Sequence, residues 1–295
     1  MNKLRAMKLF VRLSELGSFT AVADEVNATS SMVSKEIQKL EEDIGTRLLH
    51  RSTRRVQLTP IGKGYLLRCR EVLLQLDDAE AFVQQAQNIL QGKLRINLPM
   101  ALGLAELGPV FADFMAAYPD IELDIHLGDE NLDLIEHGFD LGFRASSRIF
   151  DSGYVGKPLK SFQYRICASP DYLNQYPNIE TPQDLQNHNC FVYSYFKGGN
   201  EWPVAGGVRI KGSLKVNNTL FMRDIIVAGR GIGFLPGFIA DEWISMGKLQ
   251  EILPDFERPK LNLYALYPNR KHLPPILIKC IEFINDWFKQ TTGQT

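Results

Sequence analysis

The feature that most limits how this chain can fold is a pair of short helices within residues 19–58, FTAVADEVNATSSMVSKEIQKLEEDIGTRLLHRSTRRVQL. Ser18 can cap the first helix, because its hydroxyl can accept hydrogen bonds from the free amides of the first turn. A polar turn over residues 27–29 follows, and the second helix is expected over residues 30–43. Two short helices joined by a three-residue turn predict a helix-turn-helix.

The second of these helices has one apolar side and one polar side. Val33, Ile37 and Leu40 are spaced four and three residues apart, so they share the side that packs into the domain. The opposite side is polar and uncharged or basic. Such a helix fits the major groove of DNA, where hydroxyl, amide and ammonium groups reach base edges and phosphates. The residues expected to contact DNA from this helix are Ser30, Ser31, Ser34, Lys35 and Gln38.

A basic hairpin follows the second helix, and its Arg51, Arg54 and Arg55 are suited to phosphates or to the minor groove. The charge of the whole chain is distributed unevenly, with a basic N-terminal part and an acidic remainder. Residues 1–70 hold 13 Lys and Arg against 7 Asp and Glu, a net charge of +6, whereas the remainder holds 20 against 27, a net charge of −7. An arginine run or an amphipathic helix pair alone is common in other proteins. Their combination on a basic end of an acidic body favours a DNA-binding protein.

These segments resemble the LysR-type transcriptional regulators, and the resemblance covers nearly all 295 residues. It is most specific in the runs LRAMKLFVRLSELGSFTAVADEVNAT, SSMVSKEIQKLEEDIGTRLLHR and STRRVQLTPIG. The resemblance implies that Val33–Leu40 belongs to the recognition helix and that Arg51–Leu58 is the wing. Ser30 and Ser31 stand where many members have Gln-Pro, and Glu36 replaces a common Gln. Because serine cannot bind adenine bidentately as glutamine does, we expect a different operator preference.

A long helix is expected after the hairpin. Thr59 is a suitable N-cap, Pro60 fits the first helical position, and nothing breaks the pattern before Gly92. About 30 residues of helix reach roughly 45 Å, and a helix of that length with an apolar stripe needs a partner. A second copy of the chain is the simplest partner, and the resemblance implies a linker helix that forms a homodimer, with a homotetramer built from two dimers. The alternative is that this helix packs on the rest of its own chain.

Length and composition are consistent with a soluble protein of two or three domains. No stretch approaches the roughly 18 uninterrupted apolar residues of a membrane span, and the amphipathic N-terminus lacks the apolar core of a signal peptide. We therefore expect a cytoplasmic protein without membrane contact. Cys69, Cys167, Cys190 and Cys280 lie far apart in no metal-binding spacing, so no cofactor is predicted. A redox pair of Cys167 and Cys190 is an alternative, although the alternating run around Cys167 is typical of a small core residue.

From Lys93 onward, short strand-like runs alternate with segments of helical periodicity. The expected strands cover residues 93–98, 121–127, 140–144, 164–168, 190–195, 208–216 and 262–267. The expected helices cover residues 103–118, 131–137, 170–175, 219–228 and 275–288. This rhythm predicts a largely parallel sheet, and crossovers near residues 161 and 265 would divide it into two lobes.

The expected fold is therefore α + α/β, with an N-terminal winged helix-turn-helix, a long linker helix and a two-lobed α/β effector domain. The expected domains are residues 1–59, 60–91 and 92–295, with lobe I at 92–161 and 266–295 and lobe II at 162–265. The resemblance implies that the effector domain is periplasmic-binding-protein-like and holds a small molecule between its lobes. RNA polymerase is a further expected partner.

Sites in such folds lie beyond the carboxyl ends of strands, near helix N-termini that favour anions. The residues expected to bind the effector are Pro99, Met100, Ala101, Gly128, Arg144, Phe196, Asn218, Thr219 and Gly231; Asp129 and Tyr195 adjoin two of them. Arg144 could pair with an effector carboxylate or, alternatively, tie the lobes together through an acidic neighbour. Many family members carry Ser or Thr near positions 100 and 101, so Met100 and Ala101 predict a less polar pocket or a different mode of binding.

No enzyme activity is predicted, because the chain has no phosphate-binding glycine loop, no HExxH and no GxSxG. The run Gly229-Arg-Gly-Ile-Gly follows a predicted helix instead of opening one, so it is interpreted as a tight turn. The expected function is a sequence-specific, DNA-binding transcriptional regulator that binds an inverted-repeat operator as a dimer or dimer of dimers and responds to a small-molecule effector. The alternative is a small-molecule sensor without a DNA-directed function.

Overall fold

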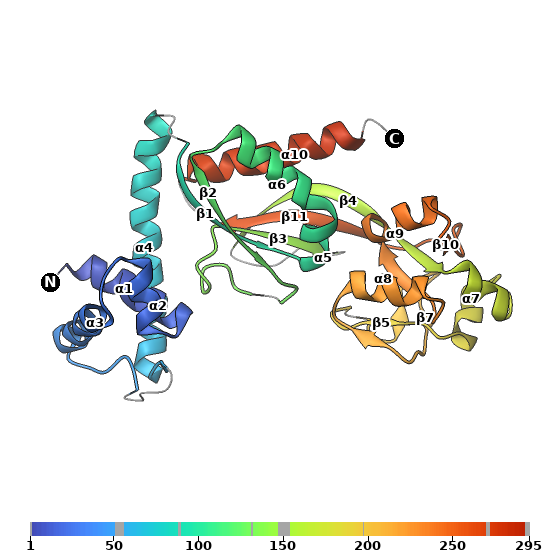
Figure 1. Cartoon of the computed structure of the whole chain (residues 1–295), viewed down its shortest axis with the longest axis horizontal. Coiled ribbons are helices and arrows are strands. Elements are labelled where there is room, and N and C mark those ends of the chain that lie inside the picture. The colour runs from blue at the N-terminus through green and yellow to red at the C-terminus, as the bar shows by residue number, and fades with distance from the viewer. Residues whose placement is uncertain are drawn as a thin grey trace. The chain divides into compact units, whose positions relative to one another are not determined.

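The structure is a computed structural model that describes residues 2–50, 56–87, 90–130, 132–146, 154–196, 198–269 and 272–292. Its contacts divide the chain into two compact units (Figure 1). The first unit consists of Met1–Ile89, Leu132–Phe139 and Arg270–Pro275. The second consists of Leu90–Asn131, Asp140–Asn269 and Ile276–Thr295.

The first unit begins with the three helices α1 (Lys3–Leu16), α2 (Phe19–Glu25) and α3 (Ser30–Ile44). Side-chain caps fix where α2 and α3 begin, because Ser18 accepts a hydrogen bond from Ala21 N and Thr29 accepts one from Met32 N. The three helices share one apolar core, which includes the predicted Val33, Ile37 and Leu40. The predicted helix-turn-helix is therefore confirmed within one residue at each end.

A hairpin base and a long helix complete this unit. Leu49 and Leu58 form an antiparallel bridge, and α4 (Pro60–Gln87) follows as a helix of 28 residues. Thr59 caps α4 as predicted, since its Oγ1 accepts a hydrogen bond from Gly62 N at 2.9 Å. Near the other end of α4, Asp78 accepts a hydrogen bond from His272 N at 2.7 Å.

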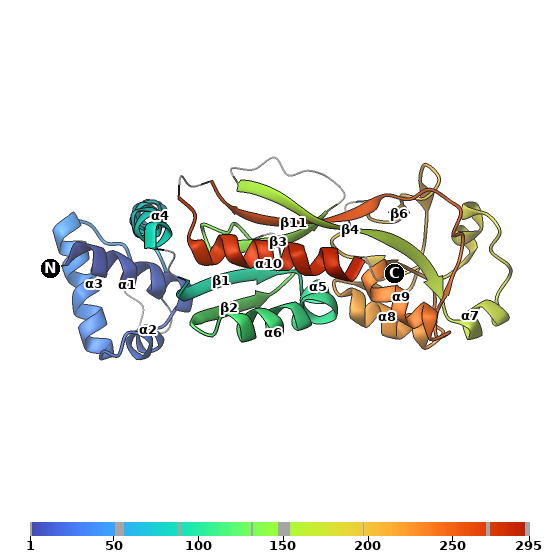
Figure 2. The same ribbon diagram turned by 90° about the horizontal axis from the view of Figure 1, so that it is seen from above.

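Lobe I of the second unit is a sheet covered on one side by helices (Figures 1 and 2). Its strands are β1 (Gly92–Leu98), β2 (Ile121–Leu127), β3 (Leu141–Ser146), β11 (Lys260–Pro268) and the first part of β4 (Tyr154–Ala168). β1 pairs in parallel with β2 and β3. One continuous helical segment, formed by α5 (Met100–Leu102), a π-helix (Gly103–Leu107) and α6 (Gly108–Ala117), lies on the same side as α10 (Pro275–Thr292).

Lobe II is built around the far end of β4, which reaches out of lobe I (Figure 2). There β4 pairs antiparallel with β9 (Gly233–Pro236) and β10 (Gln250–Glu251). The remaining strands are β5 (Val192–Tyr193), β6 (Glu201–Trp202), β7 (Val208–Arg209) and β8 (Lys215–Val216). The helices are α7 (Pro170–Gln175), a 3-10 helix (Pro182–Asn187), α8 (Thr219–Val227) and α9 (Gly237–Ser245). β11 pairs antiparallel with β4 over Tyr154–Gln163, next to the point where β4 continues into lobe II.

Several predictions for the effector domain are wrong in detail. The sheet is only partly parallel, because β11 runs antiparallel to both β3 and β4. Residues 134–138 form turns instead of a helix, since Gly138 takes a left-handed φ of 67° after a single helical turn. The strand expected over 208–216 is split into β7 and β8, and between them Gly212 lies so close to the carbonyl of Cys190 that no side chain would fit there. β9, α9 and β10 were not predicted.

All four cysteines are buried and free. Burial raises the pKa of the Cys167 thiol and that of the Cys190 thiol to about 12 each, which opposes the thiolate that redox chemistry requires. Among the described residues, Met100–Ala117 is long and apolar enough to cross a membrane by composition alone, and 39% of that segment is buried in the fold. It also contains Glu106 and Asp113, and core helices of soluble proteins meet the same criterion.

Candidate DNA-contacting and effector-binding sites

The polar side of α3 is presented to solvent. Ser31, Ser34, Lys35 and Gln38 are exposed, while Val33 on the opposite side is buried. Within the described part of the chain, Ser34 and Lys35 have no hydrogen-bond or ion-pair partner, so their polar groups are available to a ligand. The exposed side of α3 therefore has the chemistry expected of a helix that enters the major groove.

The other predicted residues of this region differ in their surroundings. Ser30 is half-buried and lies 3.4 Å from Thr20 Oγ1 of α2, and Gln38 donates a hydrogen bond to Glu42 Oε1 at 2.9 Å. Met32, which the sequence analysis did not single out, is 51% exposed on the flank of the polar side. A methionine there offers an apolar surface that could meet a thymine methyl group. The sequence does show that this apolar residue does not share the helical spacing of the buried apolar side of α3.

The base of the hairpin is held by a buried carboxylate that was also missed. Glu41 is only 9% exposed, and its Oε1 accepts hydrogen bonds from Leu48 N at 2.7 Å and Leu49 N at 3.0 Å. His50 N continues the hairpin by donating to Gln57 O at 2.9 Å. The predicted DNA contacts Arg51, Arg54 and Arg55 lie outside the described residues.

An ion cluster joins the helix-turn-helix to α4 inside the first unit. Arg70 of α4 is 6% exposed and donates a hydrogen bond to Glu15 Oε1 of α1 at 3.2 Å. Arg12 binds the same Glu15 and also Glu25 of α2, whose hydrogen bond is the main reason that the pKa of Arg12 is raised. Arg70 Nε and Nη1 are buried without a hydrogen-bond partner among the described residues.

Residues from both lobes meet at the start of the helical segment that begins with α5. Met100 N donates a hydrogen bond to Asp129 Oδ1 at 3.0 Å, and Asn218 Nδ2 of lobe II lies 3.3 Å from Met100 Sδ. Asn218 also caps α8 by accepting from Phe221 N, and Ala101 is buried within an apolar cluster that consists mainly of lobe II residues. The structure thus brings together three of the predicted effector residues, Met100, Ala101 and Asn218.

Two neutral groups of lobe I accept hydrogen bonds from Arg144. Its Nη1 donates to Asn97 Oδ1 and, at 2.8 Å, to Phe143 O, and burial lowers the pKa of its guanidinium. Asn97 is fully buried, and its Nδ2 has no partner among the described residues. Both residues belong to lobe I strands, so these contacts position Arg144 within lobe I.

The remaining predicted effector residues contribute backbone or packing. Gly231 allows close approach inside lobe II, because a Cβ there would overlap the carbonyl of Asn189. Phe196 packs against the lobe II core, and Thr219 is buried at the start of α8. The two others lie in lobe I, where Pro99 O accepts a hydrogen bond from Gly103 N and Gly128 N donates one to Leu98 O, both at 2.9 Å.

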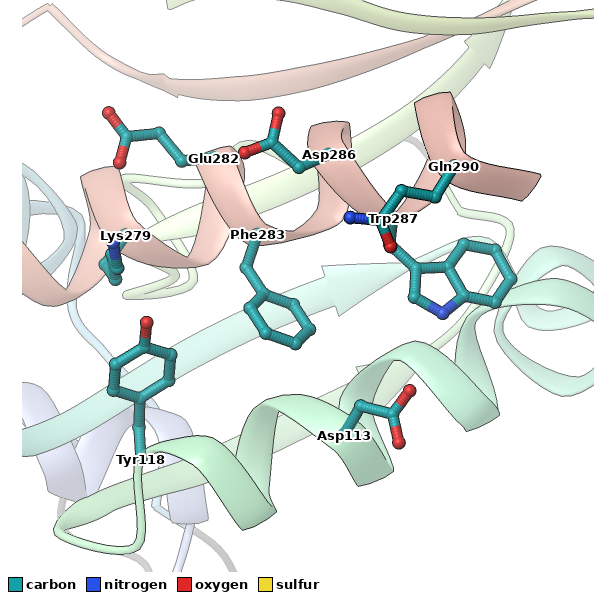
Figure 3. Close-up of a pocket in the computed structure, with 8 residues that line it drawn as sticks. All are labelled: Asp113, Tyr118, Lys279, Glu282, Phe283, Asp286, Trp287 and Gln290. Carbon is teal, nitrogen blue, oxygen red and sulfur yellow. The ribbon is translucent and has the colours of Figure 1, made fainter. Parts of the chain in front are cut away.

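A separate groove of about 330 Å³ lies on lobe I between α6 and α10 (Figure 3). Figure 3 shows Phe283 and Trp287 projecting from α10 toward α6, which contributes Asp113. The full lining is Asp113, Tyr118, Lys279, Glu282, Phe283, Asp286, Trp287 and Gln290. The rings of Tyr118 and Phe283 pack edge to face at 6.2 Å. None of the predicted effector residues lines this groove.

Two family models match the chain. The model described as "Bacterial regulatory helix-turn-helix protein, lysR family" matches residues 4–63, and that of the "LysR substrate binding domain" matches residues 87–289. This chain belongs to the LysR family. It is a DNA-binding transcriptional regulator with an effector-binding domain, in a family of regulators and not of enzymes. The alternative function, a small-molecule sensor without a DNA-directed function, is not supported, because the helix-turn-helix model matches the N-terminal residues.

Similar proteins from other bacteria support this membership. An uncharacterised HTH-type transcriptional regulator of Haemophilus influenzae is 35% identical over 280 residues, which cover 93% of this chain and 96% of that protein. The regulator YhjC of Escherichia coli is 35% identical, with 92% and 93% covered. Among solved LysR-type structures, CrgA of Neisseria meningitidis aligns with a TM-score of 0.62 at 27% identity, with 96% of this chain and 98% of CrgA covered.

Proposed function

We propose that this LysR-type regulator binds an inverted-repeat operator as a dimer or dimer of dimers and changes its DNA complex when a small molecule binds between the lobes of its effector domain. The observation that carries the proposal is the exposed polar side of α3, where Ser34 and Lys35 have no hydrogen-bond or ion-pair partner among the described residues. Lys35 is suited to a phosphate or to guanine, and Ser34 to a base edge. Ser30, Ser31, Gln38 and the wing arginines Arg51, Arg54 and Arg55 are further proposed contacts.

The proposed dimer is supported by the solvent-facing side of α4. At about 1.5 Å per residue, its 28 described residues extend about 42 Å. Five large apolar side chains on α4 are 41–58% exposed: Ile61, Leu67, Val72, Phe82 and Val83. An exposed apolar row of this length favours pairing with the same helix of a second copy. Two linked recognition helices would then read two half-sites of an inverted repeat.

The proposed effector site is supported by the contacts between lobes around Met100, Asp129 and Asn218. An effector that touches both lobes binds one arrangement of the lobes more tightly than another, and this difference in affinity is what can shift the DNA complex. Pro99, Ala101, Gly128, Arg144, Phe196, Thr219 and Gly231 complete the proposed site. We also propose that the regulator acts in the bacterial cytoplasm and contacts RNA polymerase from the operator.

The test is to incubate the full-length protein with fragmented DNA of its own genome and to sequence the retained fragments. We expect a few sites that share an inverted repeat. A Lys35→Ala variant should retain them less well, whereas Lys289→Ala on the exposed end of α10 serves as a control with the same charge change. Retention of no enriched fragment at low and at physiological salt would contradict the proposal.

A further inference from the structure

Three side chains with unused polar atoms gather where the lobes meet near Met100. Asp129 of lobe I holds Met100 N through Oδ1, and Tyr193 of lobe II lies close enough that the Asp129 charge, after burial, raises the pKa of its phenol. Tyr195 packs edge to face on Tyr193, with 5.8 Å between ring centroids. Asn218 reaches Met100 from the same lobe. Both lobes therefore contribute to one small cluster.

The cluster offers hydrogen-bonding capacity that the described part of the chain does not use. Asp129 makes one hydrogen bond there, so Oδ2 is left without a partner. The hydroxyl groups of Tyr193 and Tyr195 likewise have no hydrogen-bond partner within the described ranges. Binding sites typically combine apolar or aromatic walls with a few convergent polar groups of this kind.

The charge of this cluster opposes an anionic ligand. Asp129 already accepts the hydrogen bond of Met100 N, the amide that would otherwise attract an anion at the start of the helical segment. Met100 and Ala101 have no hydroxyl with which to bind a carboxylate. Burial raises the pKa of Asp129, because the carboxylate is partly removed from water. The single hydrogen bond from Met100 N does not offset this loss of solvation.

The same groups suit an organic cation. An ammonium group donates hydrogen bonds to a carboxylate and is attracted to the faces of aromatic rings, and a carboxylate beside tyrosine rings supplies both interactions. We propose that the effector of this regulator is a ring-bearing organic ammonium ion, held by Asp129 of lobe I and by Tyr193 and Tyr195 of lobe II. This inference rests on the proposed effector site and assigns its ligand class. Because the ligand would bridge the lobes, its binding would favour the arrangement in which they are held together.

The test uses three small molecules that share a phenyl ring and differ in charge: benzylamine, benzyl alcohol and benzoate. Their binding to the full-length protein is measured by isothermal titration calorimetry, with benzyltrimethylammonium as a second cation. We expect both cations to bind, benzyl alcohol to bind more weakly and benzoate not to bind. Affinity for benzyltrimethylammonium should fall as pH is lowered through the raised pKa of Asp129, because protonation removes the carboxylate charge.

The decisive variant is Asp129→Asn, which removes the charge but keeps an oxygen that can accept the hydrogen bond from Met100 N. We expect it to weaken cation binding by about tenfold, the equivalent of roughly 1.4 kcal/mol. Asp133→Asn is the control, since Asp133 is another loop carboxylate that accepts a backbone hydrogen bond, from Glu136 N at 2.7 Å, but it is exposed whereas Asp129 is half-buried. Tyr195→Phe should retain cation binding through its ring, whereas Tyr195→Ala should lose it.

The inference would be overturned by tighter binding of benzoate than of both cations, or by equal cation affinity in the wild type and in Asp129→Asn. Failure of both cations to bind would also overturn it. The genomic DNA capture is run on the same preparation. A protein that retains operators but binds no cation would refute only the ligand class, whereas one that retains no operator would refute the proposed function.

Discussion

Single residues in the interior of the first unit decide how the DNA-contacting elements are held. Glu41 and Arg70 are both almost fully buried, and each connects two segments of the unit through hydrogen bonds. Glu41 fixes the base of the wing, and Arg70 links α4 to α1. Neither was predicted to have this role, because the sequence shows a charge but not which backbone amides or carboxylates surround it.

Replacing Glu41 by Gln should weaken DNA binding through the wing. A neutral amide accepts the hydrogen bonds of Leu48 N and Leu49 N less strongly than a carboxylate does. We expect a loss of about 1–3 kcal/mol in the free energy of unfolding, measured by urea denaturation, and a lower operator affinity. Glu42→Gln is the matched control, because Glu42 is exposed and its carboxylate accepts a hydrogen bond from a side chain, that of Gln38. Equal effects of the two variants would contradict this role of Glu41.

Replacing Arg70 by Met should leave stability unchanged or increase it. The substitution removes two buried nitrogens that lack partners, and Glu15 keeps its ion pair with Arg12. We expect the melting temperature to stay the same or rise while affinity for a two-half-site operator falls, because α4 no longer fixes the position of α1. Arg68→Met is the control, since Arg68 is exposed on the same helix and pairs with Glu71. A lowered melting temperature would show that Arg70 mainly stabilises the fold.

At the scale of whole elements, the sequence predicts helices with side-chain caps far better than short strands. α2, α3, α4 and α8 begin where Ser, Thr or Asn caps are visible in the sequence, and each begins within one residue of its predicted start. The lobe II strands β5 to β8 have two residues each, and their pairing depends on neighbours that are distant in the sequence. Local patterns do not contain that information.

The π-helix at Gly103–Leu107 is another element that local patterns do not show. It carries Glu106, whose carboxylate is 3.6 Å from Lys160 Nζ of β4. Lys160 also lies over the rings of Phe162 and Phe288, at 5.0 and 4.8 Å from their centroids. Burial is the main reason that the pKa of Glu106 is raised, and Lys160 opposes this shift. π-helical turns often occur at functional positions, and this one adjoins the strand that connects the lobes.

Replacing Lys160 by Met should destabilise the effector domain in a pH-dependent way. Without the ammonium group, the pKa of Glu106 should rise further. A raised folded-state pKa contributes stability below the unfolded pKa, and this contribution is lost as pH rises through the folded pKa. The variant should therefore be less stable than the wild type near neutral pH, by about 1–3 kcal/mol, and the difference should shrink toward pH 4. Urea denaturation at several pH values measures this, and a difference independent of pH would contradict it.

At the scale of the whole molecule, the proposed function depends on two copies that pair through α4. Val72 lies on the exposed apolar side of that helix and is 41% exposed in the single chain. A Val72→Glu variant would place like charges at the contact between two copies, so we expect a smaller oligomer in analytical ultracentrifugation and a large loss of operator affinity. Lys289→Glu also adds a carboxylate to an exposed position, but on α10 instead of α4. It should leave the oligomeric state unchanged.

The basic end of the molecule should determine how operator binding depends on salt. Each phosphate contact made by a protein contributes about 0.9 to the slope of log affinity against log salt concentration. If Lys35 of both copies contacts phosphate, Lys35→Ala should reduce that slope by about two, and it should do so for operator and for unrelated DNA alike. Ser34→Ala should instead leave the slope unchanged and alter which base is preferred at one position of each half-site. An unchanged slope in Lys35→Ala, measured by fluorescence anisotropy across a salt series, would place Lys35 at a base edge or away from DNA.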